Sequence, residues 1–97
     1  MSAYQIRYTP MAAETIRHLH PSVKQAIREA IRGLSGDPYK GNPLAFDLTG
    51  FRSLRVSRYR VIYRIQEADR ALEIHLAGHR RDIYEVFRQF LEQAPRG

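Results

Sequence analysis

Cysteine and tryptophan are absent from this chain of 97 residues, and so are long apolar runs. The lack of cysteine excludes disulfide bonds, thiolate zinc sites and cysteine nucleophiles. No apolar stretch approaches the roughly 18 residues that a membrane span needs, and the first residues lack the apolar core of a signal peptide. We therefore expect a cytoplasmic protein that has no membrane partner.

Lysine is also scarce, because only two of the sixteen basic residues are lysines and the other fourteen are arginines. With ten acidic residues, the formal net charge is +6. Arginine presents a planar, permanently charged fork that suits phosphate groups and stacks on bases. Between positions 52 and 64, five arginines occur without any acidic residue. This excess favours a nucleic acid or an acidic protein as partner, and the simpler alternative is a solvated basic face.

The first part of the chain predicts a strand followed by a helical hairpin, within a single domain over residues 1–97. Residues 4–8 alternate apolar and polar side chains, as in a half-buried strand. Thr9 and Pro10 predict the start of one helix, and Pro21 predicts the start of a second. The second helix carries one apolar face at helical spacing, formed by Val23, Ala26, Ile27, Ala30, Ile31 and Leu34.

The second part of the chain changes to a period of two. We expect a short strand over 44–48 and further strands over 54–56, 59–65 and 72–76, the last of which ends at Gly78. Asp82 predicts the cap of a final helix whose apolar stripe is Ile83, Val86, Phe87, Phe90 and Leu91. The order predicts an α+β fold: a small, mainly antiparallel sheet with helices on one face, built from an N-terminal strand and helical hairpin, then three strands and a C-terminal helix.

The polar faces of two adjacent strands carry Arg55, Arg60 and Arg64. A hairpin brings these faces together, and like charges that face each other destabilise a sheet. The nearest acidic residues lie at the far end of the hairpin, at positions 67, 69 and 73. We therefore favour an anion-binding sheet face, with a structural network of ion pairs as the alternative.

A second candidate site lies at residues 78–81, where the chain leaves the last strand and enters the last helix. His79 can move a proton near neutral pH, and Arg80 can stabilise phosphate charge. Tyr84 lies off the apolar stripe and can stack on a base or exchange a proton. The structural alternatives are that His79 binds a backbone group, that Arg81 forms an ion pair within the helix, and that Tyr84 has no role. Neither clustered carboxylates nor histidines at ligand spacing occur, so we expect no metal site and no cofactor.

The segment LTGFRSLRVSRYRVIYRI at 48–65, with LAGHRRDIYE at 76–85, resembles the toxins of the RelE/ParE superfamily. These are the toxin halves of type II toxin–antitoxin systems. The likeness runs in order over nearly the whole chain, from the early strand and the helical hairpin to the G-H-R-R-D-x-Y end. It implies a RelE-like fold and the function of a toxin.

Resemblance to the RelE branch implies an mRNA endoribonuclease that acts in the ribosomal A site, and an acidic antitoxin protein that neutralises it. The expected reaction is metal-free attack by the ribose 2′-hydroxyl: Arg60 and Arg80 stabilise the phosphate, and His79 or Tyr84 takes the proton. The neighbouring arginines are the expected RNA-binding residues: Arg52, Arg55, Arg58, Arg64 and Arg81.

Two positions differ from the RelE pattern. Val86 stands where RelE has a functional tyrosine, and Ser53 stands where it has a lysine on a strand. The ParE branch, whose members inhibit DNA gyrase without nuclease activity, therefore remains an alternative. An inert basic interaction domain is the third interpretation.

Overall fold

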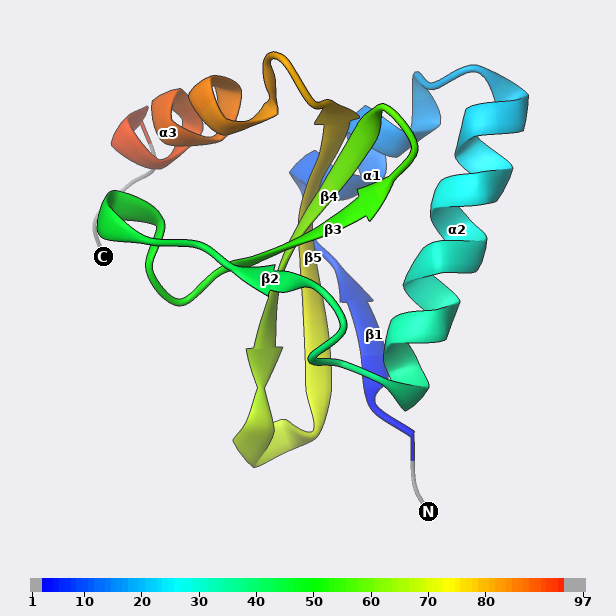
Figure 1. Cartoon of the computed structure of the whole chain (residues 1–97), viewed down its shortest axis with the longest axis vertical. Helices are drawn as coiled ribbons and strands as arrows, with labels where there is room; N and C mark the ends of the chain where they lie inside the picture. The colour runs from blue at the N-terminus through cyan, green and yellow to red at the C-terminus, as the bar shows by residue number, and fades with distance from the viewer. Residues whose placement is uncertain (1–2, 94–97) are drawn as a thin grey trace.

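The computed structural model describes residues 3–93, which form a five-stranded sheet with helices on both sides (Figure 1). The strands lie in the order β1-β5-β4-β3-β2. The N-terminal strand β1 runs parallel to β5, and the other neighbouring pairs are antiparallel. The sheet is thus mixed and mainly antiparallel, as predicted. The strands are β1 (Gln5–Tyr8), β2 (Asn42–Pro43), β3 (Arg52–Val56), β4 (Tyr59–Gln66) and β5 (Ala71–His79).

The helices are α1 (Pro10–Arg17), α2 (Pro21–Gly36) and α3 (Ile83–Gln93), with short 3-10 turns at η1 (Phe46–Leu48) and η2 (Glu67–Asp69). The side chain of Thr9 accepts a hydrogen bond from the Ala12 backbone N–H at 3.1 Å, which caps α1 as predicted. Pro21 occupies the first turn of α2, where its missing N–H leaves no helical hydrogen bond unmade. Of the helices in the described part of the chain, none is long and apolar enough to cross a membrane.

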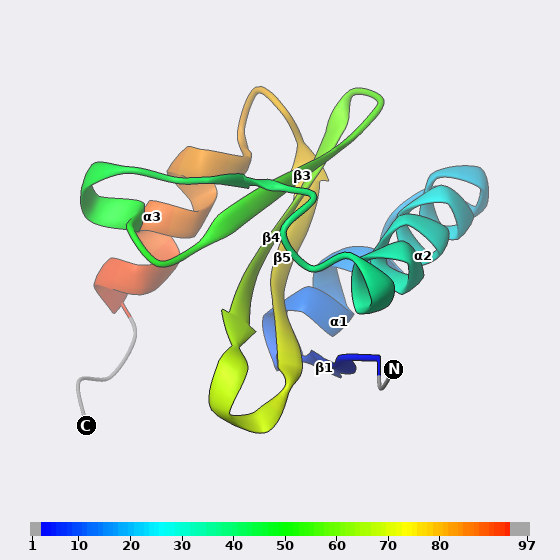
Figure 2. The ribbon, with the colours of Figure 1, turned by 60° about the horizontal axis from the view of Figure 1, so that its bottom comes forward.

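Helices lie on both sides of the sheet (Figure 2), and each face of the sheet has its own core of buried side chains. On the first, which we call the hairpin face, α1 and α2 cover apolar side chains that include Val61 and Tyr63. On the second, which we call the α3 face, Ile83 and Phe87 of α3 cover a core that includes Ile62. The expectation that the helices pack on one face is therefore wrong. Residues 61–63 form a continuous apolar run, which is typical of a strand that is buried on both faces.

The apolar stripe of α3 is narrower than the sequence predicts. Ile83 and Phe87 are buried, whereas Val86 is 40% exposed and Phe90 is 39% exposed. Both lie on the predicted apolar stripe, and the expectation that Phe90 lies in the core is wrong. No second helix lies beside α3 on this face of the sheet, so the side of its apolar stripe that carries Val86 and Phe90 faces solvent.

Two predicted strand boundaries also differ. Residues 44–48 do not form a strand, because Phe46 adopts a left-handed φ of 56° and η1 turns Leu48 into the core of the α3 face. The short edge strand β2 instead lies at Asn42–Pro43. Gly78 does not end β5, because it pairs with Arg60 and the strand continues to His79.

A β-bulge in β5 decides which way its final residues face. Ile62 of β4 pairs with Leu76, whereas Tyr63 pairs with Ile74, so His75 is an extra residue in β5. Ile74 consequently lies in the core of the hairpin face and Leu76 in the core of the α3 face, although both have the same sequence parity. Every β5 residue after the bulge faces the side opposite to the one that simple alternation predicts.

Candidate nucleic-acid interface

Arg55 of β3 and Arg60 of β4 are direct partners in the antiparallel ladder. Side chains opposite each other in such a ladder share one face, with Cβ atoms roughly 4.5–5.5 Å apart. Arg55 follows Ser53 by two residues, and Ser53 lies on the α3 face, so these two arginines do too. We call them the arginine pair. One nitrogen of Arg60 donates to the carbonyl oxygens of Ser57 at 3.1 Å and Tyr59 at 2.8 Å, which holds the guanidinium at the β3–β4 turn.

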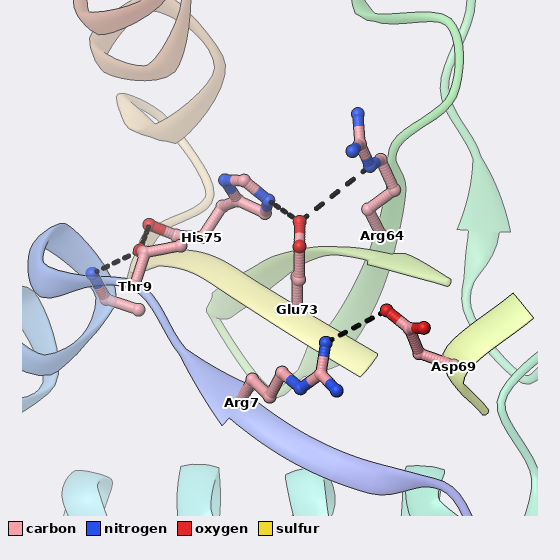
Figure 3. A network of polar contacts seen from close by, with 7 residues as sticks. Arg7, Thr9, Arg64, Asp69, Glu73 and His75 are labelled. Carbon is pink, nitrogen blue, oxygen red and sulfur yellow. Dashed lines mark hydrogen bonds and ion pairs between the residues drawn. The ribbon is translucent and has the colours of Figure 1, made fainter. Parts of the chain in front are cut away.

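Within residues 3–93, no acidic side chain forms an ion pair with either member of the arginine pair. The three acidic residues nearest in sequence are used elsewhere. Glu67 accepts the Tyr4 hydroxyl at 2.6 Å, and Asp69 pairs with Arg7 at 3.2 Å. Glu73 points between His75 and Arg64, at 3.1 Å and 3.8 Å (Figure 3). The positive charge of the arginine pair is therefore open to an external anion.

A pair of hydroxyl groups lies on the same face. The Ser53 hydroxyl of β3 and the Tyr84 hydroxyl of α3 are 2.9 Å apart. Tyr84 is half-buried and packs against the core of the α3 face, and Ser53 is 6% exposed. Ser53 is two residues from Arg55 along β3, about 7 Å at the strand repeat. The Tyr84 hydroxyl thus contacts a residue two positions from Arg55 on the same face of the sheet, although Tyr84 and Ser53 are 31 residues apart in sequence.

Arg58 and Arg80 lie at the same end of the sheet as the arginine pair. The Arg80 backbone N–H donates to the Arg58 carbonyl oxygen at 2.8 Å, which extends the β5–β4 pairing beyond the last strand residues. Both side chains are exposed. Four arginines therefore lie around the β3–β4 turn and the start of the connection into α3, one each from β3, the turn, β4 and the connection: Arg55, Arg58, Arg60 and Arg80.

His79 is not brought together with the arginine pair. It pairs with Tyr59 across the ladder, and the two rings meet edge to face with centroids 5.6 Å apart. Tyr59 packs against the core of the hairpin face, so His79 lies on that face as well. Its Nδ1 accepts a hydrogen bond from the Arg81 backbone N–H at 3.2 Å. This arrangement is the backbone-binding alternative that the sequence left open.

The remaining arginines with a predicted RNA role differ in their surroundings. Arg52 donates to the carbonyl oxygens of Tyr39 and Gly41, at 3.1 Å and 2.6 Å, and its guanidinium lies 5.1 Å from the centre of the Tyr39 ring. Arg64 pairs with Glu73, and its guanidinium lies 5.8 Å from the ring centre of Phe51. Arg81 is exposed next to the arginines at the turn. Of these three, Arg52 is the one whose guanidinium is held by loop carbonyls.

His75 was not identified as an interaction centre by sequence, because a single histidine in a strand carries no spacing signal. Its ring meets Phe51 and Phe87 edge to face, with centroids 5.1 Å and 5.9 Å away. Burial lowers the pKa of the imidazole below its ordinary value of 6.5, and the neighbouring Glu73 carboxylate opposes this shift. In the described part of the chain, no group of three or more acidic or histidine side chains is arranged to hold a metal ion.

Residues 6–84 match a family model described as the ParE toxin of type II toxin–antitoxin systems, parDE. Toxin RelG of Mycobacterium tuberculosis is 36% identical over 83 residues, which cover 84% of this chain and 95% of RelG. Toxin RelE of the same organism is 35% identical over 77 residues, which cover 76% of this chain and 79% of that protein.

Solved structures give the same likeness. The toxin–antitoxin complex RelBE2 from M. tuberculosis contains a chain that superposes with a TM-score of 0.76 at 34% identity, covering 82% of this chain and 94% of that one. The intact E. coli RelBE complex contains a chain of the same fold, with a TM-score of 0.69 at 20% identity over 79% of this chain and 96% of that one.

Proposed function

The chain belongs to the RelE/ParE family of type II toxins, and we propose that it is an endoribonuclease that cuts mRNA on the ribosome. The observation that carries this proposal is the arginine pair: Arg55 and Arg60 face each other on the α3 face, without an acidic partner among residues 3–93. Two like charges at paired positions destabilise the folded chain. The same two guanidinium groups are suited to bind one phosphodiester together.

The reaction we propose is transesterification within the RNA. The 2′-oxygen forms a bond to the adjacent phosphorus while the bond from phosphorus to the 5′-oxygen breaks, which leaves a cyclic phosphate and a 5′-hydroxyl. The arginine pair and Arg80 stabilise the negative charge that develops on the phosphoryl oxygens. Tyr84 is the proton-exchanging side chain on this face, because its hydroxyl lies beside Ser53, next to Arg55. His79, on the opposite face, is the weaker candidate for this role.

The test is cleavage of a defined mRNA on purified ribosomes, read by mapping RNA ends. The wild-type protein should cut at a fixed position in the A-site codon, and a 2′-deoxy nucleotide at that position should prevent the cut. Arg55→Ala and Arg60→Ala should each slow cleavage roughly a hundredfold to a thousandfold, as the loss of a transition-state donor does. Arg17→Ala is the matched control, since Arg17 is exposed on α1 and pairs with Glu14. An intact message, or a cut that survives the 2′-deoxy substitution, would contradict the proposal.

Inhibition of DNA gyrase is the second candidate function, because the matching family model is the one described for ParE. A gyrase inhibitor would not cleave mRNA, and its activity would not depend on the Tyr84 hydroxyl. A supercoiling assay on the same protein separates the two: loss of supercoiling with uncut mRNA would replace the nuclease proposal.

We propose an acidic antitoxin as the protein partner. Two solved relatives are toxin–antitoxin complexes, and this chain has a net charge of +6. A groove of about 470 Å3 on the surface, lined by Tyr8, Ala13, Ile16, Arg17 and Arg28, offers an apolar floor and two cations to such a partner. The product of an adjacent gene should co-purify with this chain and suppress the cleavage described above.

A further inference from the structure

Ser53 is 6% exposed, and apart from Tyr63 it is the one buried residue among positions 3–93 whose side chain carries a polar group. Buried hydroxyl groups are normally hydrogen-bonded, since an unmade bond away from water destabilises the fold. Within this part of the chain, the Ser53 side chain has a single hydrogen-bond partner, the Tyr84 hydroxyl at 2.9 Å. The strand partners of Ser53 are Ile62 of β4, which offers no polar side-chain atom, and Asn42 of β2, whose exposed side chain forms no hydrogen bond with the Ser53 hydroxyl.

Either hydroxyl of this pair can donate, and the two arrangements differ in what they leave unmade. If Tyr84 donates, the proton of Ser53 has no acceptor in its buried position. If Ser53 donates, its proton is satisfied, and the proton of Tyr84, a side chain that is only half-buried, is not used in this contact. The second arrangement leaves no buried donor unpaired and is therefore favoured.

We infer that Ser53 is a positioning residue that makes Tyr84 the proton donor of the cleavage site; this inference rests on the proposed nuclease function. The Tyr84 proton passes to the 5′-oxygen as its bond to phosphorus breaks, and the proton of the attacking 2′-hydroxyl passes to water. The Ser53 hydroxyl then donates to the phenolate oxygen that Tyr84 retains. The arginine pair, on the same face, stabilises the phosphoryl charge during the same step.

The geometry fixes Tyr84 from two sides. The ring packs against the core that contains Ile62 and Phe87, and the hydroxyl is held by a residue of the sheet itself. The Ser53 side chain points to the same face as Arg55 because the two are separated by one residue in β3. One short segment of β3 therefore supplies both an orienting hydroxyl and a phosphate-binding cation.

The experiment measures single-turnover cleavage at saturating ribosomes for Ser53→Ala, Ser53→Cys, Ser53→Thr and Tyr84→Phe, and for the double variant S53A/Y84F. Ser53→Ala should slow cleavage about tenfold, as the loss of one hydrogen bond does, and should change the half-saturating ribosome concentration less than about twofold. Ser53→Thr should restore most of the rate because it keeps the O–H donor, and Ser53→Cys, with a weak donor, should fall between. In the Tyr84→Phe background, Ser53→Ala should have no further effect.

Two results would overturn the inference while the proposed function stands. The first is a wild-type cleavage rate in the Ser53→Ala or the Tyr84→Phe protein. The second is an equal loss of cleavage rate from Ser53→Ala whether or not the Tyr84 hydroxyl is present. The second result would mean that Ser53 only supports the packing of α3, and thermal unfolding of each variant checks this independently. Failure of the wild-type protein to cut any message would overturn the proposed function, and this inference with it.

Discussion

At the scale of single residues, Arg55 and Arg60 are suited to bind phosphate, but their like charges lower the stability of the fold. Their side chains carry like charges at directly paired positions, and the nearby acidic residues are bound to other partners. A ladder position of this kind normally holds opposite charges or uncharged side chains. The pair is thus expected to make the fold slightly less stable than it would be with a neutral or acidic residue at one position.

Arg55→Glu tests this trade-off. An acidic side chain opposite Arg60 should raise the free energy of unfolding by about 0.5 kcal/mol, measured by urea denaturation. The same substitution should abolish mRNA cleavage, because it replaces a phosphate-binding cation with an anion. Lys40→Glu makes an equal change of charge on an exposed loop residue and should leave cleavage at the wild-type rate. A stable but fully active Arg55→Glu protein would exclude the arginine pair from the site.

The residues of the site differ in how well sequence predicts them. Alternation along two neighbouring strands places Arg55 and Arg60 on one polar face, and the structure pairs them directly. The position of His79 is not predictable in this way, because the bulge at His75 reverses the face of every later residue in β5. The contact between Ser53 and Tyr84 joins positions 31 residues apart, and local periodicity carries no information about it.

At the scale of elements, the loop between α2 and β2 is held to the sheet by one buried hydroxyl. The Tyr63 hydroxyl donates to the Pro38 carbonyl oxygen at 2.7 Å and accepts from the Gly41 N–H at 3.0 Å. A Cβ atom at Gly41 would lie 2.6 Å from that hydroxyl oxygen, so the close approach requires glycine. The loop in turn supplies the carbonyl groups that hold Arg52.

Tyr63→Phe should therefore lower the free energy of unfolding by about 1–3 kcal/mol, because it leaves two buried backbone groups without their partner. Tyr8→Phe is the control, since Tyr8 is 45% exposed on the edge strand β1. Equal stability of the Tyr63→Phe and wild-type proteins in urea denaturation would mean that water replaces the lost hydroxyl.

The helices and strands that sequence predicts correctly are those whose own residues carry a cap, a proline or a regular apolar pattern. The Thr9 cap of α1, the proline at the first position of α2 and the single apolar face of α2 specify that hairpin without reference to the rest of the chain. The segment 44–48 has no such signal, and its conformation depends on Leu48 reaching the core beneath α3. The exposure of Phe90 likewise depends on how much of α3 the sheet can cover, which is a property of tertiary packing.

At the scale of the whole molecule, stability depends on a core on each face of the sheet, and His75 belongs to the α3 face. Its ring packs on Phe51 and Phe87, and its pKa is lowered, chiefly by burial. Below pH 6.5 the unfolded chain therefore binds a proton at this position that the folded chain does not bind until lower pH. The contribution of a neutral His75 is fully present above that pH and is lost as the pH falls through the folded-state value.

His75→Gln should flatten the decline in unfolding free energy that occurs as the pH falls below 6.5, the ordinary histidine value. Urea denaturation at several pH values measures the slope directly. His18→Gln is the control for replacing a histidine at the surface, because the His18 side chain is 65% exposed. An identical slope in the His75→Gln and wild-type proteins would assign the acid sensitivity to carboxylates alone.

The parallel pairing of β1 with β5 joins the start of the chain to its last strand, with Gln5 opposite Ala71 and Tyr8 opposite Ile74. During synthesis the first strand has no neighbour in the sheet until residue 74 has left the ribosome, so sheet assembly is a late event governed by long-range contacts. Arg60 likewise acquires its second strand neighbour, Gly78, only after β5 has been synthesised. A nascent molecule therefore lacks the complete sheet around the arginine pair until β5 has been synthesised, and the proposed cleavage has to wait for that strand.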